Sequence, residues 1–214
     1  MDVDRSHRAR LHAALGDAHR LGIVDELAVS DRSPTELGQR FELPSNLLAH
    51  HLDVLEAAGL IERFVSAGDR RRRYVRLVRA PLADLGVATV RPVGTVLFVC
   101  THNSARSQLA AVLWRHRTGG AATSAGTHPA PHVHPGAVAA AWRVGLDLSD
   151  AAPQVLDDPS TAAVVVTVCD RAHEELDPDP DWWHWSIPDP ADVGTDEAFD
   201  AVIADLDARI ATLH

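Results

Sequence analysis

The chain has 214 residues, 46% of them hydrophobic, which is enough for one large or two modest cores, and no apolar run approaches the ~20 residues that cross a bilayer. The acidic start Met1-Asp2-Val3-Asp4 is unlike a signal peptide, so we expect a cytoplasmic protein without a membrane partner. Two cysteines are too few for a disulfide scaffold, and in a reducing compartment they are more typical of catalytic or redox roles. Residues 1–90 carry 13 arginines and 13 acidic side chains, whereas residues 91–214 carry 7 arginines and 17 acidic side chains, so the net charge of −10 lies in the second part. This asymmetry favours two domains, and the acidic second part is expected to bind nucleic acid poorly.

Helical patterns open the chain. Apolar residues recur at helical spacing over residues 8–27, with a break near Gly16. Ser33-Pro34-Thr35-Glu36 combines a capping serine, a proline at the first helical position and a glutamate three residues after the cap. A short helix is therefore expected to begin there and to end near Phe41.

A second helix and a hairpin are expected to follow. Ser45 is expected to cap a helix that Gly59 closes. Two strands, at 60–65 and 72–78, flank Ser66-Ala67-Gly68-Asp69, a typical hairpin connection. Helix, turn, helix and hairpin together predict a winged helix-turn-helix domain over residues 1–80, mainly α with a β-hairpin wing.

The segments LGDAHRLGIVDEL and LPSNLLAHHLDVLEAAGLIERF resemble the ArsR-type family of winged-helix regulators, over about residues 8–79. The resemblance implies that the second helix of the pair enters the major groove of double-stranded DNA, that the hairpin meets the phosphates, and that the protein is a homodimer. The residues that it places at DNA are Ser45, Asn46, His50, His51, Arg70, Arg71, Arg72 and Arg73.

Two positions depart from that family's pattern. Ala49 and Asp53 stand where members often carry a serine and a lysine, and this change weakens phosphate binding. No cysteine precedes Cys100, so the thiolate clusters with which members sense metals are absent. The domain is expected either to bind DNA or to survive as a dimerisation or docking module.

Prolines and glycines predict a linker over residues 81–94, after which strands alternate with helices. The expected elements are a strand at 95–99, a helix at 107–117, a short strand ending at 124–127, a helix at 133–144, a strand at 161–169 and a final helix at 196–213. This alternation predicts an open, parallel α/β sheet over residues 95–214. Ligand sites in such sheets lie at the carboxyl ends of the strands, where Cys100, Cys169 and the loop before Asp189 are expected to converge.

The turn from Cys100 to Ser107 is the strongest chemical signal in the chain. A strand, five loop residues and an arginine that opens a helix leave loop N–H groups and a helix N-terminus facing one small space, which suits a tetrahedral oxyanion. These dipoles and Arg106 favour the nucleophilic thiolate of Cys100, and Arg106 can bind the same anion with two parallel hydrogen bonds. The residues expected to bind the oxyanion are Thr101, His102, Asn103, Ser104, Ala105, Arg106 and Ser107. The alternative is a cysteine that is merely buried at the end of a core strand.

Residues 95–213 resemble the low-molecular-weight tyrosine phosphatase superfamily through VLFVCTHNSARSQLA, SAGT, VGLDLS and IPDPADVGTDEAFDAVIADLDARI. The resemblance implies a four-stranded parallel sheet. Arsenate reductases are the nearer match, because Gln108 replaces the proline usual in the phosphatases and VVVTVCD is followed by HWSIPDP. What the resemblance implies is that Cys100 attacks arsenate held by the loop and Arg106, while Asp189 donates a proton to the leaving oxygen.

A second thiol is needed to release arsenite from the Cys100 adduct. Thioredoxin-coupled reductases carry another cysteine seven residues after the position of Cys169, where this chain has Leu176. Either Cys169 resolves the adduct, or a small thiol such as mycothiol or glutathione attacks it directly. The missing cysteine favours the small thiol, and no tightly bound cofactor is expected.

Three functions stay open. The first is an arsenate reductase fused to a DNA-binding-type domain, favoured by Gln108 and the region around Cys169. The second is a low-molecular-weight protein tyrosine phosphatase that uses Cys100, Arg106 and Asp189, and the third is a transcriptional regulator with a C-terminal oxyanion or thiol sensor. No metal site is predicted, because the proline-rich loop with three histidines offers no carboxylate or cysteine at a ligand spacing. These histidines are His128, His132 and His134.

Overall fold

The computed structural model describes residues 2–82 and 94–213. The chain divides into two compact units, the first made of residues 1–66 and 70–88 and the second of residues 67–69 and 89–214. The predicted linker at 81–94 lies largely outside the described residues, and its first two residues belong to a short 3-10 turn, η1 (Ala80–Leu82). Each unit is therefore described by itself.

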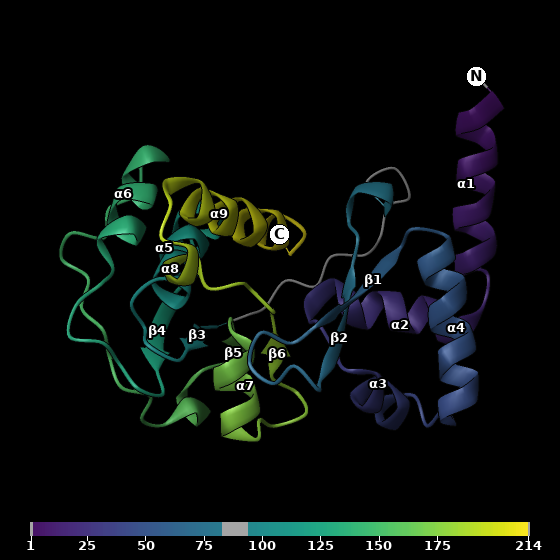
Figure 1. The fold of residues 1–214 in the computed structure, drawn as a ribbon, viewed down its shortest axis with the longest axis horizontal. Coiled ribbons are helices and arrows are strands. Elements are labelled where there is room, and N and C mark those ends of the chain that lie inside the picture. The colour runs from purple at the N-terminus through teal and green to yellow at the C-terminus, as the bar shows by residue number, and fades with distance from the viewer. Residues whose placement is uncertain (1, 83–93, 214) are drawn as a thin grey trace. The chain divides into compact units, whose positions relative to one another are not determined.

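The described part of the first unit contains four α-helices and an antiparallel hairpin (Figure 1). Their bounds are α1 (Asp2–Leu15), α2 (Ala18–Val29), α3 (Pro34–Arg40), α4 (Ser45–Ala57), β1 (Ile61–Val65) and β2 (Arg73–Leu77). Apolar side chains from the helices and the hairpin form one core, in which Leu27, Leu37 and Leu55 are fully buried. The order α3, α4 and hairpin is that of a winged helix-turn-helix, as the sequence predicts.

Of the two helix starts predicted in this unit from capping residues, one is confirmed and one is wrong. The Ser33 hydroxyl accepts the backbone N–H of Glu36 while the Glu36 carboxylate accepts that of Ser33, so the predicted capping box forms. The break near Gly16 is also present, because α1 ends at Leu15. The prediction for Ser45 is wrong: Ser45 is the first residue of α4, the N-cap is Pro44, and no side chain caps the helix.

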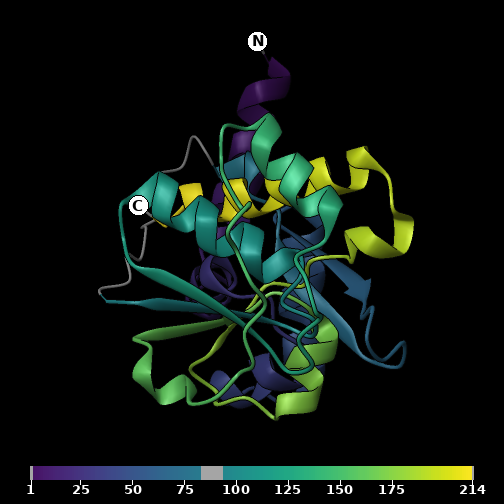
Figure 2. The same ribbon diagram turned by 90° about the vertical axis from the view of Figure 1, so that its left-hand side faces the viewer.

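The second unit is built on a parallel sheet of strand order β4-β3-β5-β6 (Figures 1 and 2). The strands are β3 (Val96–Cys100), β4 (Ala122–Gly126), β5 (Val164–Thr167) and β6 (Trp183–His184). The helices are α5 (Arg106–Thr118), α6 (Pro135–Arg143), α7 (Asp170–Leu176), α8 (Pro190–Val193) and α9 (Asp196–Ala211), with a 3-10 turn η2 (Pro159–Thr161). Helices α5, α6 and α9 lie over one face of the sheet and α7 covers the other, so the predicted four-stranded α/β fold is confirmed.

The central strand β3 is buried on both faces, as expected of a strand between two helical layers. On one face Phe98 packs against Trp114 and Trp185, with ring centroids 6.0 and 5.6 Å apart. On the other face Leu97 and Val99 belong to a separate apolar cluster. Because the strands are parallel, β3, β4 and β5 end at the same edge of the sheet.

The region around Cys169 differs from the prediction. The strand expected at 161–169 is shorter, because Thr161 ends the 3-10 turn η2 and β5 spans only Val164–Thr167. Cys169 follows the strand as the N-cap of α7, a helix that the sequence patterns did not indicate. The apolar run is continuous in sequence, but its last residues turn away from the sheet to begin this seven-residue helix.

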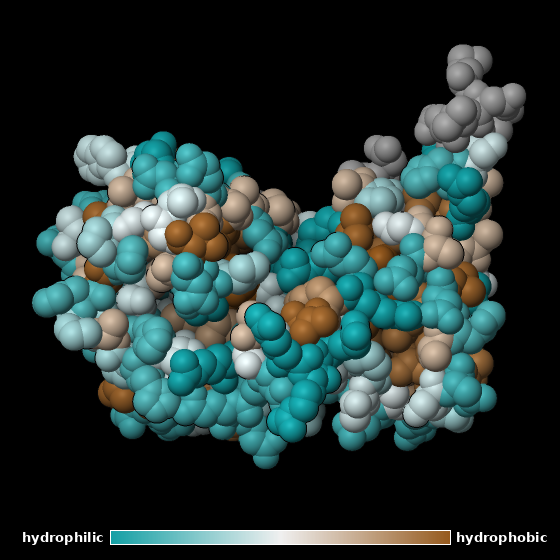
Figure 3. Space-filling view, in the orientation of Figure 1, coloured by the Kyte–Doolittle hydropathy of each residue, from teal (hydrophilic) through white to brown (hydrophobic). Residues whose placement is uncertain are grey.

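Hydrophilic residues cover most of the face of both units that Figure 3 shows, with hydrophobic residues scattered among them. Such scattered exposure is ordinary for a folded surface. Among the residues that the structure describes, no helix combines the length and the apolar character needed to cross a bilayer.

Candidate active site

The loop between β3 and α5 is held from outside by the backbone of residues 127–134. Four of its carbonyl oxygens accept hydrogen bonds from that segment, with N···O distances between 2.8 and 3.2 Å. The pairs are Thr127 to Cys100, His128 to Thr101, Ala130 to His102 and His134 to Ser104. In a trans peptide the C=O and the N–H of the next residue point in opposite directions. Because these four carbonyl groups face outward, the N–H groups of the residues that follow them face the concave side of the loop. Together with the N-terminus of α5 they make a cradle suited to a tetrahedral oxyanion.

Cys100 lies at the floor of this cradle and is almost completely buried. The backbone N–H of Asn103 donates to its Sγ at 3.2 Å, and the Ser107 hydroxyl lies 3.0 Å from the same sulfur. Because Ser107 Oγ accepts a hydrogen bond from Asn103 Nδ2 at 2.7 Å, its own proton is free to point at the sulfur. These two contacts hold the sulfur in place beneath the cradle, and a cysteine acts as a nucleophile in its thiolate form.

Asn103 holds the shape of the loop. Its φ of 47° lies in the left-handed region, where asparagine is among the few side chains that are tolerated. The side-chain oxygen accepts hydrogen bonds from Gln108 Nε2 at 3.0 Å and from the backbone N–H of Gln154 at 2.7 Å. Gln108 therefore supports the loop through Asn103, and the part played by Gln154 was not apparent from the sequence.

Gly126, the last residue of β4, lies directly against the loop. A Cβ built at this position would stand 2.8 Å from the carbonyl oxygen of Thr101 and 2.9 Å from the backbone nitrogen of Asn103. Real Cβ atoms essentially never approach backbone atoms this closely. The glycine in the motif SAGT is thus needed for the sheet edge and the loop to pack together.

Gly126→Ala is expected to destabilise the second unit by about 1–3 kcal/mol, because the added methyl group displaces the backbone of the loop. Tryptophan fluorescence during urea unfolding measures this unit alone, since all five tryptophans follow Cys100. Gly145→Asn is the control: nothing lies near its Cβ position and asparagine tolerates its φ of 77°. Equal stability of the two variants would contradict the packing argument.

Arg106 and Asp189 are brought together by the fold. The Arg106 side chain is nine-tenths buried, and its Nη1 donates to the carbonyl oxygen of Ile187 at 3.1 Å while Nη2 pairs with Asp189 Oδ2. Asp189 also caps α8, because its Oδ1 accepts the backbone N–H of Ala191 at 3.1 Å. The carboxyl group is therefore fixed beside the guanidinium that borders the cradle, where it can exchange a proton with an anion bound there.

Cys169 lies next to the loop, in contact with Thr101. Its side chain is fully buried, its Sγ is 3.3 Å from Thr101 Oγ1, and it accepts the backbone N–H of Ala172 at 3.4 Å. Burial raises the pKa of this thiol, against a smaller lowering by the charge of Arg106. Cys169 thus contacts Thr101, the residue that follows Cys100, but its thiol is held in the protonated form and caps a helix. Leu176 packs against the apolar cluster beneath the sheet.

A buried polar network next to Cys169 was missed from the sequence. Thr167 Oγ1 lies 2.9 Å from Nδ1 of both His173 and His184, whose rings stack with centroids 4.0 Å apart. His184 Nε2 lies 3.1 Å from Asp170 Oδ1. Burial acts to raise the pKa of Asp170, but hydrogen bonds from His184 and Ser186 and the charge of His184 lower it to about 2. The network joins the ends of β5 and β6 to the start of α7.

The histidines of the proline-rich loop have separate positions. His134 caps α6, accepting the backbone N–H of Gly136 at 3.1 Å, and stacks on Phe199. The carbonyl oxygen of His128 lies 3.1 Å from His102 Nδ1. Within the described residues, the one grouping of three metal-type ligands lies elsewhere, in the first unit.

The residues predicted to contact DNA are exposed, with one exception. The exposed ones are Ser45, Asn46, His50, Arg70, Arg71, Arg72 and Arg73. The prediction for His51 is wrong: only 5% of this residue is exposed, and it lies on the buried face of α4, so its imidazole is not placed to contact DNA. Asp53, which departs from the family pattern, pairs with Arg63 of β1 at 2.7 Å, so each neutralises the other.

A cysteine at the end of a parallel strand, an N–H-lined loop and an arginine opening the next helix define a phosphatase-type oxyanion site. The family model for low molecular weight phosphotyrosine protein phosphatases matches residues 95–214, and the chain belongs to this family. A model for a helix-turn-helix domain matches residues 15–63.

Several relatives match about half of this chain and most of their own length. An arsenate reductase of Brevibacillus brevis is 37% identical over 123 residues, which are 54% of this chain and 90% of that protein. An arsenate reductase of Halalkalibacterium halodurans is 36% identical over 110 residues, 48% of this chain and 78% of that protein. A low molecular weight protein tyrosine phosphatase from T. tengcongensis aligns with a TM-score of 0.50 and 24% identity, covering 56% of this chain and 97% of that one, and indicates the fold alone.

Proposed function

We propose that this chain is an arsenate reductase whose catalytic domain, residues 95–214, is fused to a DNA-binding domain, residues 1–80. The observation that carries the proposal is the geometry of Cys100, whose sulfur receives the Asn103 N–H and lies against Ser107 beneath an oxyanion cradle. The 37% identity to an arsenate reductase over 90% of its length supports the choice of substrate.

The first chemical step uses the groups that surround the cradle. Arsenate is bound by the N–H groups of residues 101–107 and by the Arg106 guanidinium. The Cys100 thiolate attacks arsenic, a sulfur–arsenic bond forms, and one arsenic–oxygen bond breaks. Asp189, in its protonated form, gives a proton to the departing hydroxyl group of arsenate, which leaves as water. Ser107 and Asn103 hold the loop and the thiolate in place.

The second step needs an external thiol, and we infer that it is a small one such as mycothiol or glutathione. Its thiolate attacks the Cys100 sulfur of the adduct, a sulfur–sulfur bond forms, and the sulfur–arsenic bond breaks with its electron pair going to arsenic, so arsenite leaves. The mixed disulfide between Cys100 and the small thiol is then reduced by a second thiol of the cell's pool, which restores Cys100. Burial and a raised pKa make Cys169 a poor nucleophile, and Leu176 offers no further thiol. No tightly bound cofactor takes part in this scheme, and its free thiols suit a reducing, cytoplasmic setting.

Cys169→Ser separates the two possible resolving thiols. With a small thiol as reductant, the variant is expected to keep arsenate reduction within about threefold of wild type, because serine can still cap α7 at Ala172. The measurement is arsenite release with glutathione, mycothiol and a thioredoxin system, each supplied in turn. A variant that is inactive with every reductant would instead assign the resolving role to Cys169.

Phosphatase activity is the second candidate function, because the family model that matches residues 95–214 describes phosphotyrosine phosphatases. The same residues would form a cysteinyl-phosphate that water hydrolyses. The deciding experiment compares arsenate reduction and aryl phosphate hydrolysis by the same preparation. A kcat/KM for the aryl phosphate well above that for arsenate would make this chain a phosphatase, and turnover of neither would favour an oxyanion sensor.

For the first unit we propose binding to double-stranded DNA as a homodimer. The helix-turn-helix match over residues 15–63 and the exposed first turn of α4, with Ser45 and Asn46, support it. In such domains the second helix enters the major groove, and a dimer contacts two half-sites.

Replacing Arg70, Arg71, Arg72 and Arg73 together by glutamine is expected to weaken DNA binding and to reduce the slope of log K against log salt by about one for each phosphate that an arginine no longer neutralises. The measurement is a mobility shift of the protein's own promoter fragment at several salt concentrations. Arg10→Gln, an exposed arginine of α1, is the control. Absence of any shift by the wild type at low salt would reduce this unit to a docking or dimerisation module.

A further inference from the structure

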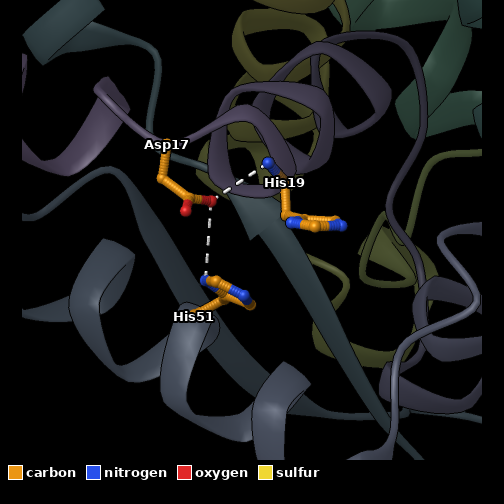
Figure 4. A group of neighbouring side chains, drawn as sticks. All are labelled: Asp17, His19 and His51. Carbon is orange, nitrogen blue, oxygen red and sulfur yellow. Dashed lines mark hydrogen bonds and ion pairs between the residues drawn. The ribbon is translucent and has the colours of Figure 1, made fainter.

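Three side chains that can bind metal ions meet in the first unit (Figure 4). Asp17 precedes α2, His19 lies in the first turn of that helix, and His51 comes from α4. One potential ligand atom from each lies within 4.8 Å of the others. Sequence patterns did not indicate this cluster, because 31 residues separate the second and third members and only helix packing joins them.

His51 carries the strongest indication that the cluster binds something. Its side chain is buried, with 5% of the residue exposed, yet neither ring nitrogen has a hydrogen-bond partner among the described residues. Its Nδ1 lies 3.7 Å from Asp17 Oδ1, close but beyond a hydrogen bond. Buried polar atoms are nearly always paired, so an orphaned imidazole facing a carboxylate points to an ion or a water in between.

The other two members are positioned to complete such a site. Asp17 Oδ1 accepts the backbone N–H groups of His19 and Arg20, both at 3.0 Å, so the carboxylate is fixed at the start of α2. His19 is exposed, and its ring centroid lies 5.5 Å from that of His51. The nearby Arg20 guanidinium, whose charge opposes a cation, donates to the backbone carbonyl oxygens of Ala13 and Ala14.

We propose that Asp17, His19 and His51 form a binding site for a divalent transition-metal ion of the Zn²⁺ class, with water in the remaining position. Two imidazoles and one carboxylate are a ligand set that zinc accepts, at about 2.0–2.2 Å from each donor, which places the donors of a tetrahedral site about 3.3 Å apart. Asp17 and His51 are already near that separation, and the exposed His19 ring can rotate to close the rest. The ion would join the start of α2 to the helix that carries the proposed DNA contacts.

The test is a Co²⁺ titration of the full-length, metal-stripped protein, followed by visible absorption and repeated in a Cys100→Ser/Cys169→Ser background to remove the thiols. One Co²⁺ per chain is expected, displaced by Zn²⁺. His19→Ala and His51→Ala are each expected to weaken binding at least about tenfold. His50→Ala is the matched control, because this histidine is exposed on the same helix, its ring centroid lies 6.0 Å from that of His51, and it is outside the cluster.

A second readout guards against misfolding of the His51 variant. Zn²⁺ is expected to raise the thermal unfolding midpoint of the wild type and of His50→Ala, but not that of His19→Ala, whose exposed side chain can be removed without disturbing the core. The proposal is overturned if the wild type binds no Co²⁺, or if His19→Ala binds it as tightly as His50→Ala. The buried nitrogens of His51 would then be satisfied by water.

Discussion

Cys100→Ser is expected to abolish arsenate reduction, with turnover falling at least about 10³-fold for every thiol reductant. The serine hydroxyl fits the space of the thiol, but at neutral pH it supplies no anionic nucleophile and cannot undergo thiol exchange. The loop N–H groups and Arg106 remain in place, so the variant is expected to bind arsenate or phosphate nearly as well as wild type. Turnover is measured as arsenite release, and binding by calorimetry.

This pairing of results separates a chemical role from a structural one. Ser107 Oγ lies 3.0 Å from the Cys100 sulfur, and a serine at position 100 can keep a hydrogen bond to it, so the thermal unfolding midpoint is expected to change little. Arsenate reduction that persists in Cys100→Ser would contradict the proposed nucleophile. Loss of oxyanion binding together with turnover would show that the substitution had disturbed the loop rather than the chemistry.

Arg106→Lys is expected to lower kcat/KM for arsenate by about 10²–10³-fold. Lysine keeps the charge, but it cannot present two parallel N–H groups to the anion while also contacting the loop that carries Asp189. The guanidinium now donates to the carbonyl oxygen of Ile187 and pairs with Asp189, so the substitution also releases the proposed proton donor. Steady-state kinetics measure the effect, which is expected in both kcat and KM.

Arg117→Lys provides the matched control. Arg117 of α5 pairs with an aspartate as Arg106 does, but on the surface of the same unit: its guanidinium donates two hydrogen bonds to Asp207, at 2.6 and 2.7 Å. Exposed pairs contribute little, so kcat/KM is expected to stay within about twofold of wild type. An equal loss in the two variants would mean that Arg106 acts through general stability. A wild-type rate in Arg106→Lys would remove the bidentate contact from the mechanism.

Local sequence patterns predicted much of the secondary structure, because the responsible interactions span few residues. The capping box of Ser33 and Glu36 involves atoms three residues apart, and the hairpin and the buried strand β3 follow from short apolar and turn patterns. The oxyanion loop is equally local, since a strand, five residues and an arginine opening a helix suffice to direct N–H groups at one point. The strand expected at 161–169 was too long, because a continuous run of apolar residues does not show where the chain leaves the sheet.

The sequence by itself determined the loop that follows Cys100 and the two kinds of fold. Tertiary packing decided which distant side chains meet. His51 is buried against the start of α2 rather than exposed at DNA, because α4 packs that face inward. Burial raises the pKa of the Cys169 thiol, and Arg106 meets Asp189 only because parallel strands end at one edge. The Asp17, His19 and His51 cluster arises in the same way. Contacts between elements depend on three-dimensional packing, which local periodicity does not encode.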